Sequence, residues 1–295
     1  AFLNPPTIKS VRRTGGFWTR TSSALAMKAN FRLLAVTLTL LSASLAGCLG
    51  GDDSSADEYS GPINLVVFYD STSGMIETSV NNGQQGPTTG VELSFDFADS
   101  TSEDGAITKI MLDPDDGSDP VEGDPSDNAV ISYTWMTHGV FEITLSAEDD
   151  EGNSHSIEVK IRIDMHIVWT ESNTASSAMS FDATPDCEDG EPLPDRITVS
   201  STVDNPNSGP IWGGGANSDV TWTLSNPSDE EIASNNGIIG DGSSETWDYT
   251  SRDIAEGIWK LNIEVAENGD DVNVTNDVTI AYAEGTEDPV NPRAE

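Results

Sequence analysis

Residues 138–165 read HGVFEITLSAEDDEGNSHSIEVKIRIDM and decide the class of fold. Two alternating runs flank an acidic turn: residues 141–147 and 157–163 place apolar side chains at every second position, with polar or charged residues between them. Because successive side chains of a strand point to opposite faces of the sheet, each run predicts a half-buried strand. The Gly-containing turn at residues 149–153 predicts that the two strands form a hairpin.

The same alternation recurs on both sides of this hairpin. Upstream, residues 91–97 read VELSFDF and place four apolar side chains on one face. Downstream, alternating runs occur at residues 197–203, 220–224, 259–265 and 278–282. Short strands separated by Gly, Pro, Asn, Asp and Ser are typical of antiparallel sandwiches, and a βαβ fold would need long helical segments between them. We therefore expect an all-β protein.

Two antiparallel β-sandwiches in tandem account for this pattern. We expect the first to span residues 62–165 and the second to span residues 166–284. No Gly/Pro linker separates them, and residues 161–169 read as one nearly continuous strand, which indicates a stiff connection. The last residues, 285–295 (GTEDPVNPRAE), are expected to form a frayed, disordered tail.

Motifs in the first sandwich carry a family resemblance. Residues 102–107 read SEDGAI, and residues 138–145 (HGVFEITL) are followed by DDEGN at 149–153. These segments resemble the S-x-D-G-x-I turn and the closing p-G-x-Y-x-V-x-L … D-x-x-G-N pattern of the polycystic kidney disease (PKD) repeat domain. The resemblance covers about residues 62–165. It implies an immunoglobulin-like β-sandwich, usually an extracellular spacer or interaction module.

The match to the PKD pattern is incomplete. Residues 113–117 (DPDDG) stand where the family has W-D-F-G-D-G, and Leu112 stands where the family has Trp. The stretch from Ser71 to Gly90 resembles an insertion. In the second sandwich, the run GIWKLNI at residues 257–263 resembles immunoglobulin-like or jelly-roll-like accessory domains of secreted proteins.

The N-terminal segment differs from the rest of the chain in charge. Residues 1–51 contain no Asp or Glu but carry six of the 13 basic residues. From Met27 onward, Lys28 and Arg32 precede an apolar run at residues 33–45, which has the length of a secretory signal and is short for a membrane-spanning helix. The residues before Cys48 (LAG) then resemble a lipoprotein lipobox.

This order of segments predicts a lipoprotein. We expect a signal peptide at residues 27–47, a lipidated Cys48 at the start of the mature chain, and an acidic Gly/Ser tether at residues 48–61. Residues 1–26 are interpreted as upstream translated sequence. An uncleaved anchor helix, or a cleaved secreted protein with a free Cys48, are the alternatives.

Charge limits the class of partner. The chain has 51 acidic and 13 basic residues, a formal net charge of −38. Such a surface repels phosphate backbones, so we expect no nucleic-acid partner. Lipidation of Cys48 would leave Cys187 as a single thiol, which lies between Asp186 and Glu188, carboxylates that disfavour its thiolate form.

Motifs of enzymes are missing from the sequence. It contains no G-x-S-x-G elbow, H-E-x-x-H helix or phosphate-binding Gly loop. Carboxylates are abundant, but a glycosidase needs one acid in an apolar setting at a fixed distance from a second. We therefore predict no catalytic residues and a chain that is not an enzyme.

Four carboxylates offer the sharpest candidate for a metal site. Oxygen ligands on a turn suit Ca²⁺, although the spacing fails the EF-hand pattern because no Glu closes the loop. A solvated acidic face is the alternative interpretation. The candidate Ca²⁺ ligands are Asp113, Asp115, Asp116 and Asp119.

Two further residues are candidate sites. Trp212 lies in the Gly-rich loop GPIWGGG at residues 209–215, where it would bind a sugar ring or a protein, or else cap the sandwich. Asn273 begins the sequon N-V-T and is a candidate glycosylation site.

These features together predict a non-catalytic cell-surface protein, held outside the cytoplasm by the lipid on Cys48. Its expected work is adhesion, envelope spacing or extracellular binding, with the membrane and an envelope protein or glycan as partners. The alternative is an accessory subunit of a secreted hydrolase or transport complex, with catalysis on another chain.

Overall fold

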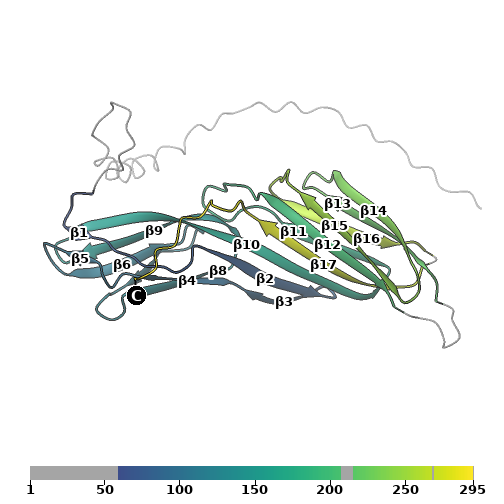
Figure 1. The fold of residues 1–295 in the computed structure, drawn as a ribbon, viewed down its shortest axis with the longest axis horizontal. Coiled ribbons are helices and arrows are strands. Elements are labelled where there is room, and N and C mark those ends of the chain that lie inside the picture. Colours follow the sequence, from purple (N-terminus) through teal and green to yellow (C-terminus); the bar gives the residue numbers. More distant parts are fainter. Residues whose placement is uncertain (1–58, 207–214, 268, 295) are drawn as a thin grey trace, which may run out of the picture. The chain divides into compact units, whose positions relative to one another are not determined.

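The computed structural model describes residues 59–206, 215–267 and 269–294, which are all-β and without a helix (Figure 1). The described residues therefore include no helix long and apolar enough to cross a bilayer. The strands up to the shared strand β10 are β1 (Ile63–Asn64), β2 (Ser73–Asn81), β3 (Gln84–Thr89), β4 (Val91–Asp96), β5 (Thr101–Ser102), β6 (Ile107–Asp113), β7 (Val121–Gly123), β8 (Val130–Trp135), β9 (Gly139–Asp149) and β10 (Ser154–Thr174). Those that follow are β11 (Ser176–Asp182), β12 (Arg196–Asn205), β13 (Ser218–Ser225), β14 (Glu231–Ile239), β15 (Ser243–Ser251), β16 (Ile258–Val265) and β17 (Val272–Ala281).

The first sandwich is built around the hairpin of β9 and β10. Phe141 lies opposite Ile161, and Leu145 lies opposite Ile157, in the antiparallel register that the alternation predicts. The apolar face of this hairpin packs with the sheet of β4 and β8, whose Trp135 is fully buried. The expected hairpin and β-sandwich are thereby confirmed.

The second sandwich places the sheet β11-β16-β13-β14 against the strands β15-β12-β17-β10. Trp222 and Trp259 are fully buried between these two layers, because both alternate with polar residues along their strands and face inward. A buried polar group sits beside them. Trp222 Nε1 donates to Ser201 Oγ at 3.0 Å, and Ser201 Oγ donates to Asn276 Oδ1 at 2.6 Å.

Strand β10 belongs to both sandwiches. Its 21 residues span about 70 Å at 3.3 Å per residue. The first half pairs antiparallel with β9 as far as Ile163, and the second half pairs antiparallel with β17 from Met165 onward. The apolar alternation continues without a break through this change of partner, which is why one strand serves two cores.

The insertion-like stretch from Ser71 to Gly90 is a structural part of the sheet. It forms the hairpin of β2 and β3, and β2 pairs with residues 162–170 of β10 (Figure 1). This pairing is parallel, so the fold departs here from the purely antiparallel sandwich that we expected. The hairpin covers the edge of β10 opposite β17, which would otherwise be open.

The C-terminal residues are held against the first sandwich, where the sequence suggested a frayed tail. The backbone groups of Asn291 and Tyr69 form a bridge, and Asp288 N donates to Lys160 O at 2.9 Å. Arg293 forms ion pairs with Asp96 and Asp99. Polar composition alone suggested disorder, but ladder-like backbone bonds and ion pairs fix residues 285–294 in place.

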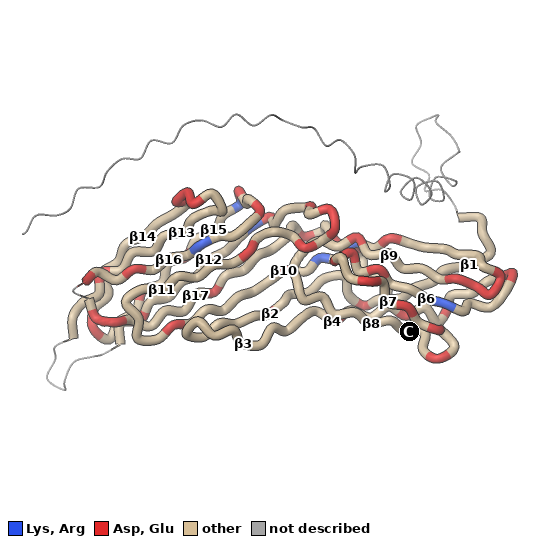
Figure 2. The backbone as a smooth tube through the Cα atoms, turned by 180° about the vertical axis from the view of Figure 1, so that it is seen from behind, with Lys and Arg blue, Asp and Glu red and all other residues tan. Residues whose placement is uncertain are grey.

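Charge is distributed as the composition requires. Acidic residues recur along the backbone of both sandwiches, and the few Lys and Arg lie singly among them (Figure 2).

Candidate functional site at the junction of the two sandwiches

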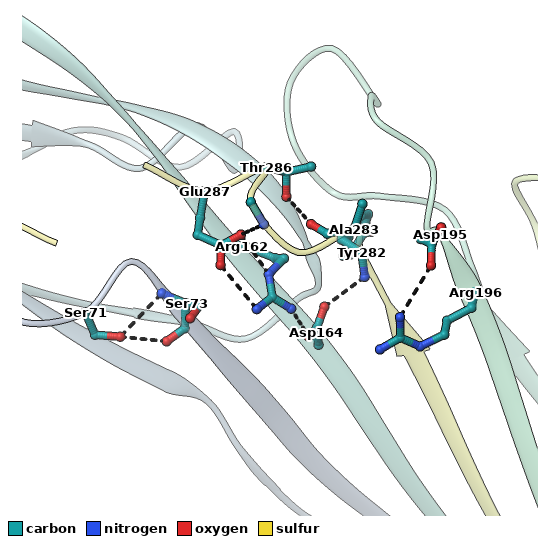
Figure 3. Close-up of polar contacts among 11 residues, drawn as sticks. Ser71, Ser73, Arg162, Asp164, Asp195, Arg196, Tyr282, Ala283, Thr286 and Glu287 are labelled. Carbon is teal, nitrogen blue, oxygen red and sulfur yellow. Dashed lines mark hydrogen bonds and ion pairs between the residues drawn. The ribbon is translucent and has the colours of Figure 1, made fainter. Parts of the chain in front are cut away.

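The junction lies at the point of β10 where its pairing with β9 stops, at Ile163, and its pairing with β17 starts, at Met165. Asp164, between the last partner of β9 and the first partner of β17, turns its carboxylate toward the end of β17 (Figure 3). Its Oδ1 accepts a hydrogen bond from Tyr282 N at 2.9 Å. A side chain thus binds a backbone N–H just beyond the end of the β17 ladder.

Arg162 joins the junction to the C-terminal segment. It forms ion pairs with Asp164 and with Glu287, whose Oε2 lies 3.0 Å from Arg162 Nε (Figure 3). The three side chains are only 14%, 10% and 19% exposed, in the order Arg162, Asp164 and Glu287. Burial alone would lower the pKa of Arg162, but the hydrogen bond that Arg162 donates to Glu287 and the two negative charges outweigh burial and raise the pKa. Burial likewise would raise the pKa of Glu287, and its hydrogen bonds, including those with Arg162, lower it.

His138 ties three segments together in the buried part of the junction. Its Nε2 lies 3.1 Å from the carbonyl oxygen of Asp182, and its Nδ1 lies 2.7 Å from the hydroxyl of Tyr282. Since a carbonyl only accepts, Nε2 carries the proton and Nδ1 accepts from the Tyr282 hydroxyl. Burial lowers the pKa of His138 despite nearby carboxylates, so the neutral ring is the form that the fold retains.

The loop between β11 and β12 folds back from the second sandwich onto the first. Asp186 N donates to His138 O at 3.1 Å, and Glu188 N donates to Asp115 O at 3.2 Å. Between them, Cys187 is buried in the core of the first sandwich. Burial, followed by the hydrogen bond and charge of Asp189, raises the pKa of Cys187 to about 11. The thiol is therefore protonated at neutral pH, and a nucleophilic role is disfavoured.

A hollow of about 440 Å³ opens beside this loop. Carboxylates and one lysine dominate its polar lining: Asp115, Glu142, Asp189, Glu191 and Lys160. Lys160 Nζ lies 3.6 Å from Glu142 Oε2. Burial raises the pKa of Asp115, although its Oδ2 accepts a hydrogen bond from Glu142 N at 2.7 Å. The hollow presents negative charge to solvent, with no histidine, serine or cysteine in its lining.

Of the four candidate Ca²⁺ ligands, Asp115 lines this hollow, and the others lie at the end of β6 and in the turn that follows it. Asp113 Oδ1 accepts from Asp115 N, and Asp116 accepts from Ser118 N and from the Tyr133 hydroxyl at 2.6 Å. Across the described residues, no three His, Cys, Asp or Glu side chains converge as they would around a metal ion. The structure therefore does not bring these four carboxylates together as a ligand set, and Ca²⁺ binding stays a prediction for a melting comparison in Ca²⁺ and in EGTA.

The other sites predicted from sequence are distributed as follows. Cys48 and Trp212 lie outside the described residues. Asn273 lies in β17 between β10 and β12, where its Oδ1 accepts from Asn173 N and its Nδ2 contacts Asp204 Oδ2 at 3.3 Å. Its amide is thus engaged within the sheet, and glycosylation at Asn273 stays a prediction.

Sequence reasoning missed the junction itself. Arg162 and Asp164 read as ordinary outward residues of an alternating strand, and Glu287 lies in a segment expected to be disordered. His138 is the first residue of the segment that resembles the closing PKD pattern, and that pattern indicates no buried contact for it. The one signal that could have found them is the unbroken strand at residues 161–169, because a shared strand requires a change of partner somewhere along it.

Comparison with known proteins gives one family match. Residues 78–164 match the family model of the PKD domain. This confirms the resemblance seen in the motifs for that part of the first sandwich. A search of curated proteins by sequence finds no match.

Several solved structures are distantly similar in fold. One, from work on the promiscuous specificity of carbohydrate-binding modules of the β-sandwich superfamily, is 16% identical with a TM-score of 0.27, over 76% of this chain and 98% of that one. Another, Bacteroides uniformis β-glucuronidase 2, is 9% identical with a TM-score of 0.26, over 75% of this chain and 30% of that one. The Bacteroides ovatus protein SGBP-B is 7% identical with a TM-score of 0.17, over 70% and 52%.

Proposed function

We propose that this chain is a non-catalytic, lipid-anchored protein of the cell surface, in which two sandwiches form a stiff spacer for adhesion or envelope organisation. The single observation that carries the proposal is strand β10. A bend between the sandwiches would have to break its pairing with β9, β17 or β2, all of which meet within residues 162–165.

The junction adds to this stiffness. His138, Asp164 and Tyr282 link segments that are far apart in the sequence through buried hydrogen bonds. Two further segments contact parts of the first sandwich that lie outside β10. The loop that carries Cys187 binds the backbone of His138 and Asp115, and the C-terminal segment binds Tyr69 and Asp96. Three segments therefore connect the two sandwiches and resist a hinge motion between them: β10, the loop that carries Cys187, and the C-terminal segment. Many tandem domains are instead joined by a single flexible linker.

Chemistry at the junction supports a non-catalytic role. The one buried thiol there is protonated, His138 is occupied by Tyr282 and Asp182, and the lining of the hollow contains no histidine, serine or cysteine. A catalytic Ser–His or Cys–His pair needs both side chains within hydrogen-bond reach of each other. A net charge of −38 keeps such a surface hydrated and is screened at high ionic strength.

The anchor is tested by fractionation. The full chain, expressed in a host that processes lipoproteins, is expected in the membrane fraction and accessible to external protease. Cys48→Ser is expected to shift it to the soluble fraction, and Cys187→Ser is the matched control. Retention of the Cys48→Ser protein in the membrane would overturn the lipid anchor.

The spacer is tested by the distance between the sandwiches. Spin labels on cysteines at Ser126 and Ser228, both exposed, report it in the Cys48→Ser chain. We expect one narrow distance distribution, which broadens when Arg162 and Asp164 are both replaced by Gly. A broad distribution in the parent protein would contradict a stiff spacer.

The accessory-subunit alternative predicts a different partner. Purification of the lipidated chain from its own cells would then recover an enzyme or transporter in stoichiometric amount. Binding of the purified chain to cells or glycans, without such a subunit, supports adhesion.

A further inference from the structure

Strand β14 is the outermost strand of the four-stranded sheet. In the described part of the chain its ladder pairs it with β13 alone, so its other edge is open. Figures 1 and 2 both place it at the margin of the second sandwich. An open edge presents unpaired backbone N–H and C=O groups, which can template pairing with another strand.

Charged residues and proline, which protect many edge strands, are missing from most of β14, although the Glu245 carboxylate of β15 lies against Gly237. The sequence of β14 is EIASNNGII, so residues 232–239 contain no charge and no proline. Ile232 and Ile238 are 37% and 70% exposed on the outer face. The opposite edge of the same sheet, β11, carries Ser176, Ala178 and Ser180 in the corresponding outward positions. Large apolar side chains on an open edge are therefore specific to β14 in this sheet.

The free backbone groups of β14 belong to its even-numbered residues. Ala266 N donates to Asp219 O, so the odd-numbered residues of β13 bond to β16, and Val265 N, which donates to Ala175 O just before β11 on the other side, agrees with this. The even-numbered residues of β13 therefore bond to β14, and Trp222 exchanges hydrogen bonds with Asn235. Residues 234, 236 and 238 consequently point their N–H and C=O groups to the open edge.

The strand is self-complementary about Asn235. We propose that β14 pairs antiparallel with β14 of a second copy of this chain, about a two-fold axis at Asn235. Ile232 then lies opposite Ile238 of the partner subunit, and Ser234 lies opposite Asn236 of the partner subunit. These are the residues whose backbone groups face the open edge, so the ladder bonds and the side-chain contacts agree.

Other registers lose this agreement. A shift of two residues in one direction places Ile238 opposite Glu230 of the partner subunit. A shift of two residues in the other direction places Ile232 opposite Gly240 of the partner subunit, which lies beyond the end of β14. A shift by one residue opposes free backbone groups with groups already bonded to β13. The register about Asn235 alone forms two Ile–Ile pairs, and a closed two-fold interface needs such self-complementarity.

Net charge opposes the pairing of two copies and therefore sets a diagnostic salt dependence. Each chain carries a net charge of −38, so two copies repel, but the paired segment from Ile232 to Ile239 is uncharged. Screening therefore strengthens the association as salt rises. A basic partner would show the opposite dependence. The inference goes beyond the proposed spacer function, which needs no second copy.

The test is the mass of the full chain carrying Cys48→Ser, measured by sedimentation velocity across a concentration series in 0.1 M and 2 M NaCl. We expect a monomer–dimer equilibrium that is stronger at 2 M. Ile238→Lys is expected to weaken the dimer by roughly tenfold or more, because it places a charge against an apolar partner. Ala178→Lys on β11 and Ile258→Lys on the same sheet face are the matched controls, and both should dimerise like the parent protein.

Two more variants separate the proposal from a folding defect. Asn236→Pro removes an N–H that β13 does not use and one exposed hydrogen bond from Thr221, so it should lower the melting temperature only slightly and abolish the dimer. Asn235→Cys should cross-link to its own copy under oxidation, and Ser234→Cys should not. A monomer at all concentrations and salts, a dimer indifferent to Ile238→Lys and Asn236→Pro, or an open ladder of oligomers would each overturn the proposal. The spacer function would survive any of these results, because it rests on β10.

Discussion

The carboxylate of Asp164 accepts the backbone N–H of Tyr282 at 2.9 Å, across 118 residues of chain. This contact marks the place where β10 exchanges β9 for β17. Two strands that meet end to end along a third leave backbone groups without ladder partners, and buried groups of this kind must be satisfied. Asp164 supplies the acceptor, and Arg162 compensates its charge. The pair therefore makes a shared strand compatible with two cores.

Removal of Arg162 is expected to destabilise the protein strongly. Arg162→Met leaves Asp164 and Glu287 as largely buried carboxylates without a cation, which costs about 3 kcal/mol in free energy of unfolding. Denaturant titration at constant pH measures this difference. Arg293→Met, which removes two ion pairs whose side chains are about half exposed, should cost less than about 1 kcal/mol. Equal losses for the two variants would show that burial at the junction is unimportant.

His138 is expected to make stability depend on pH near neutrality. Its pKa is lowered in the folded state by burial, so the unfolded chain binds more protons once the pH falls below about 6.5. Stability is fully present above that pH and decreases as the pH falls toward the folded pKa. The parent protein should therefore melt at a lower temperature at pH 5.5 than at pH 7.5.

Replacement of His138 tests this assignment. His138→Phe leaves the Tyr282 hydroxyl and the Asp182 carbonyl without their partner, at a cost of about 2 kcal/mol at pH 7.5. The same variant should lose much of the difference in melting temperature between the two pH values. His155→Gln, which alters a histidine outside the junction, should retain it. A pH dependence unchanged in His138→Phe would assign the effect to another group.

Particular residues show how far the sequence predicts this fold. Phe141 and Ile161 lie opposite each other in the hairpin as expected, because a period of two directly encodes one buried face. Strand β2 escaped prediction for the same reason. Its fully or nearly fully buried residues, Ile76 and Val80, lie four positions apart, so no period-two signal is present. Because β2 is held mainly by its pairing with β10, its own sequence does not show the alternation of apolar and polar residues that would predict a strand.

The junction was beyond prediction for a different reason. The ion pair of Arg162 and Glu287 joins residues 125 positions apart, and neither residue type nor spacing indicates such a partner. The acidic cluster at residues 113–119 was visible, but composition could not show that Asp115 and Asp116 accept bonds from Glu142 N and the Tyr133 hydroxyl. Local patterns predict strands well, and contacts between distant segments require the folded chain.

The stability of the second sandwich is expected to depend on the hydroxyl oxygen of Ser201, which links the buried side chains of Trp222 and Asn276. Ser201→Ala removes the acceptor of Trp222 Nε1 and the donor to Asn276 Oδ1, two groups that water cannot reach. The expected loss is about 3 kcal/mol in free energy of unfolding. Ser200→Ala changes the neighbouring residue on the solvent face of β12 and should cost about 0.5 kcal/mol or less. Urea titrations of both variants make the comparison, and similar midpoints would argue that the core rearranges to satisfy both groups.

Asp149 is expected to stabilise the hairpin turn of β9 and β10 only in its charged form. Hydrogen bonds from Ser102 Oγ and Asn153 lower its pKa to about 2. A lowered carboxyl pKa contributes stability above the unfolded pKa, near 3.9, and this contribution is lost as the pH falls toward 2. Asp149→Asn should therefore lower the melting temperature by several degrees at pH 7, and the gap to the parent protein should close between pH 4 and pH 2. Asp104→Asn makes the same change of charge on a nearby turn and should leave the melting temperature nearly unchanged at both ends of this range. If the difference in melting temperature stays constant down to pH 2, the loss in Asp149→Asn comes from the geometry of the amide, and the charge of Asp149 contributes nothing to stability.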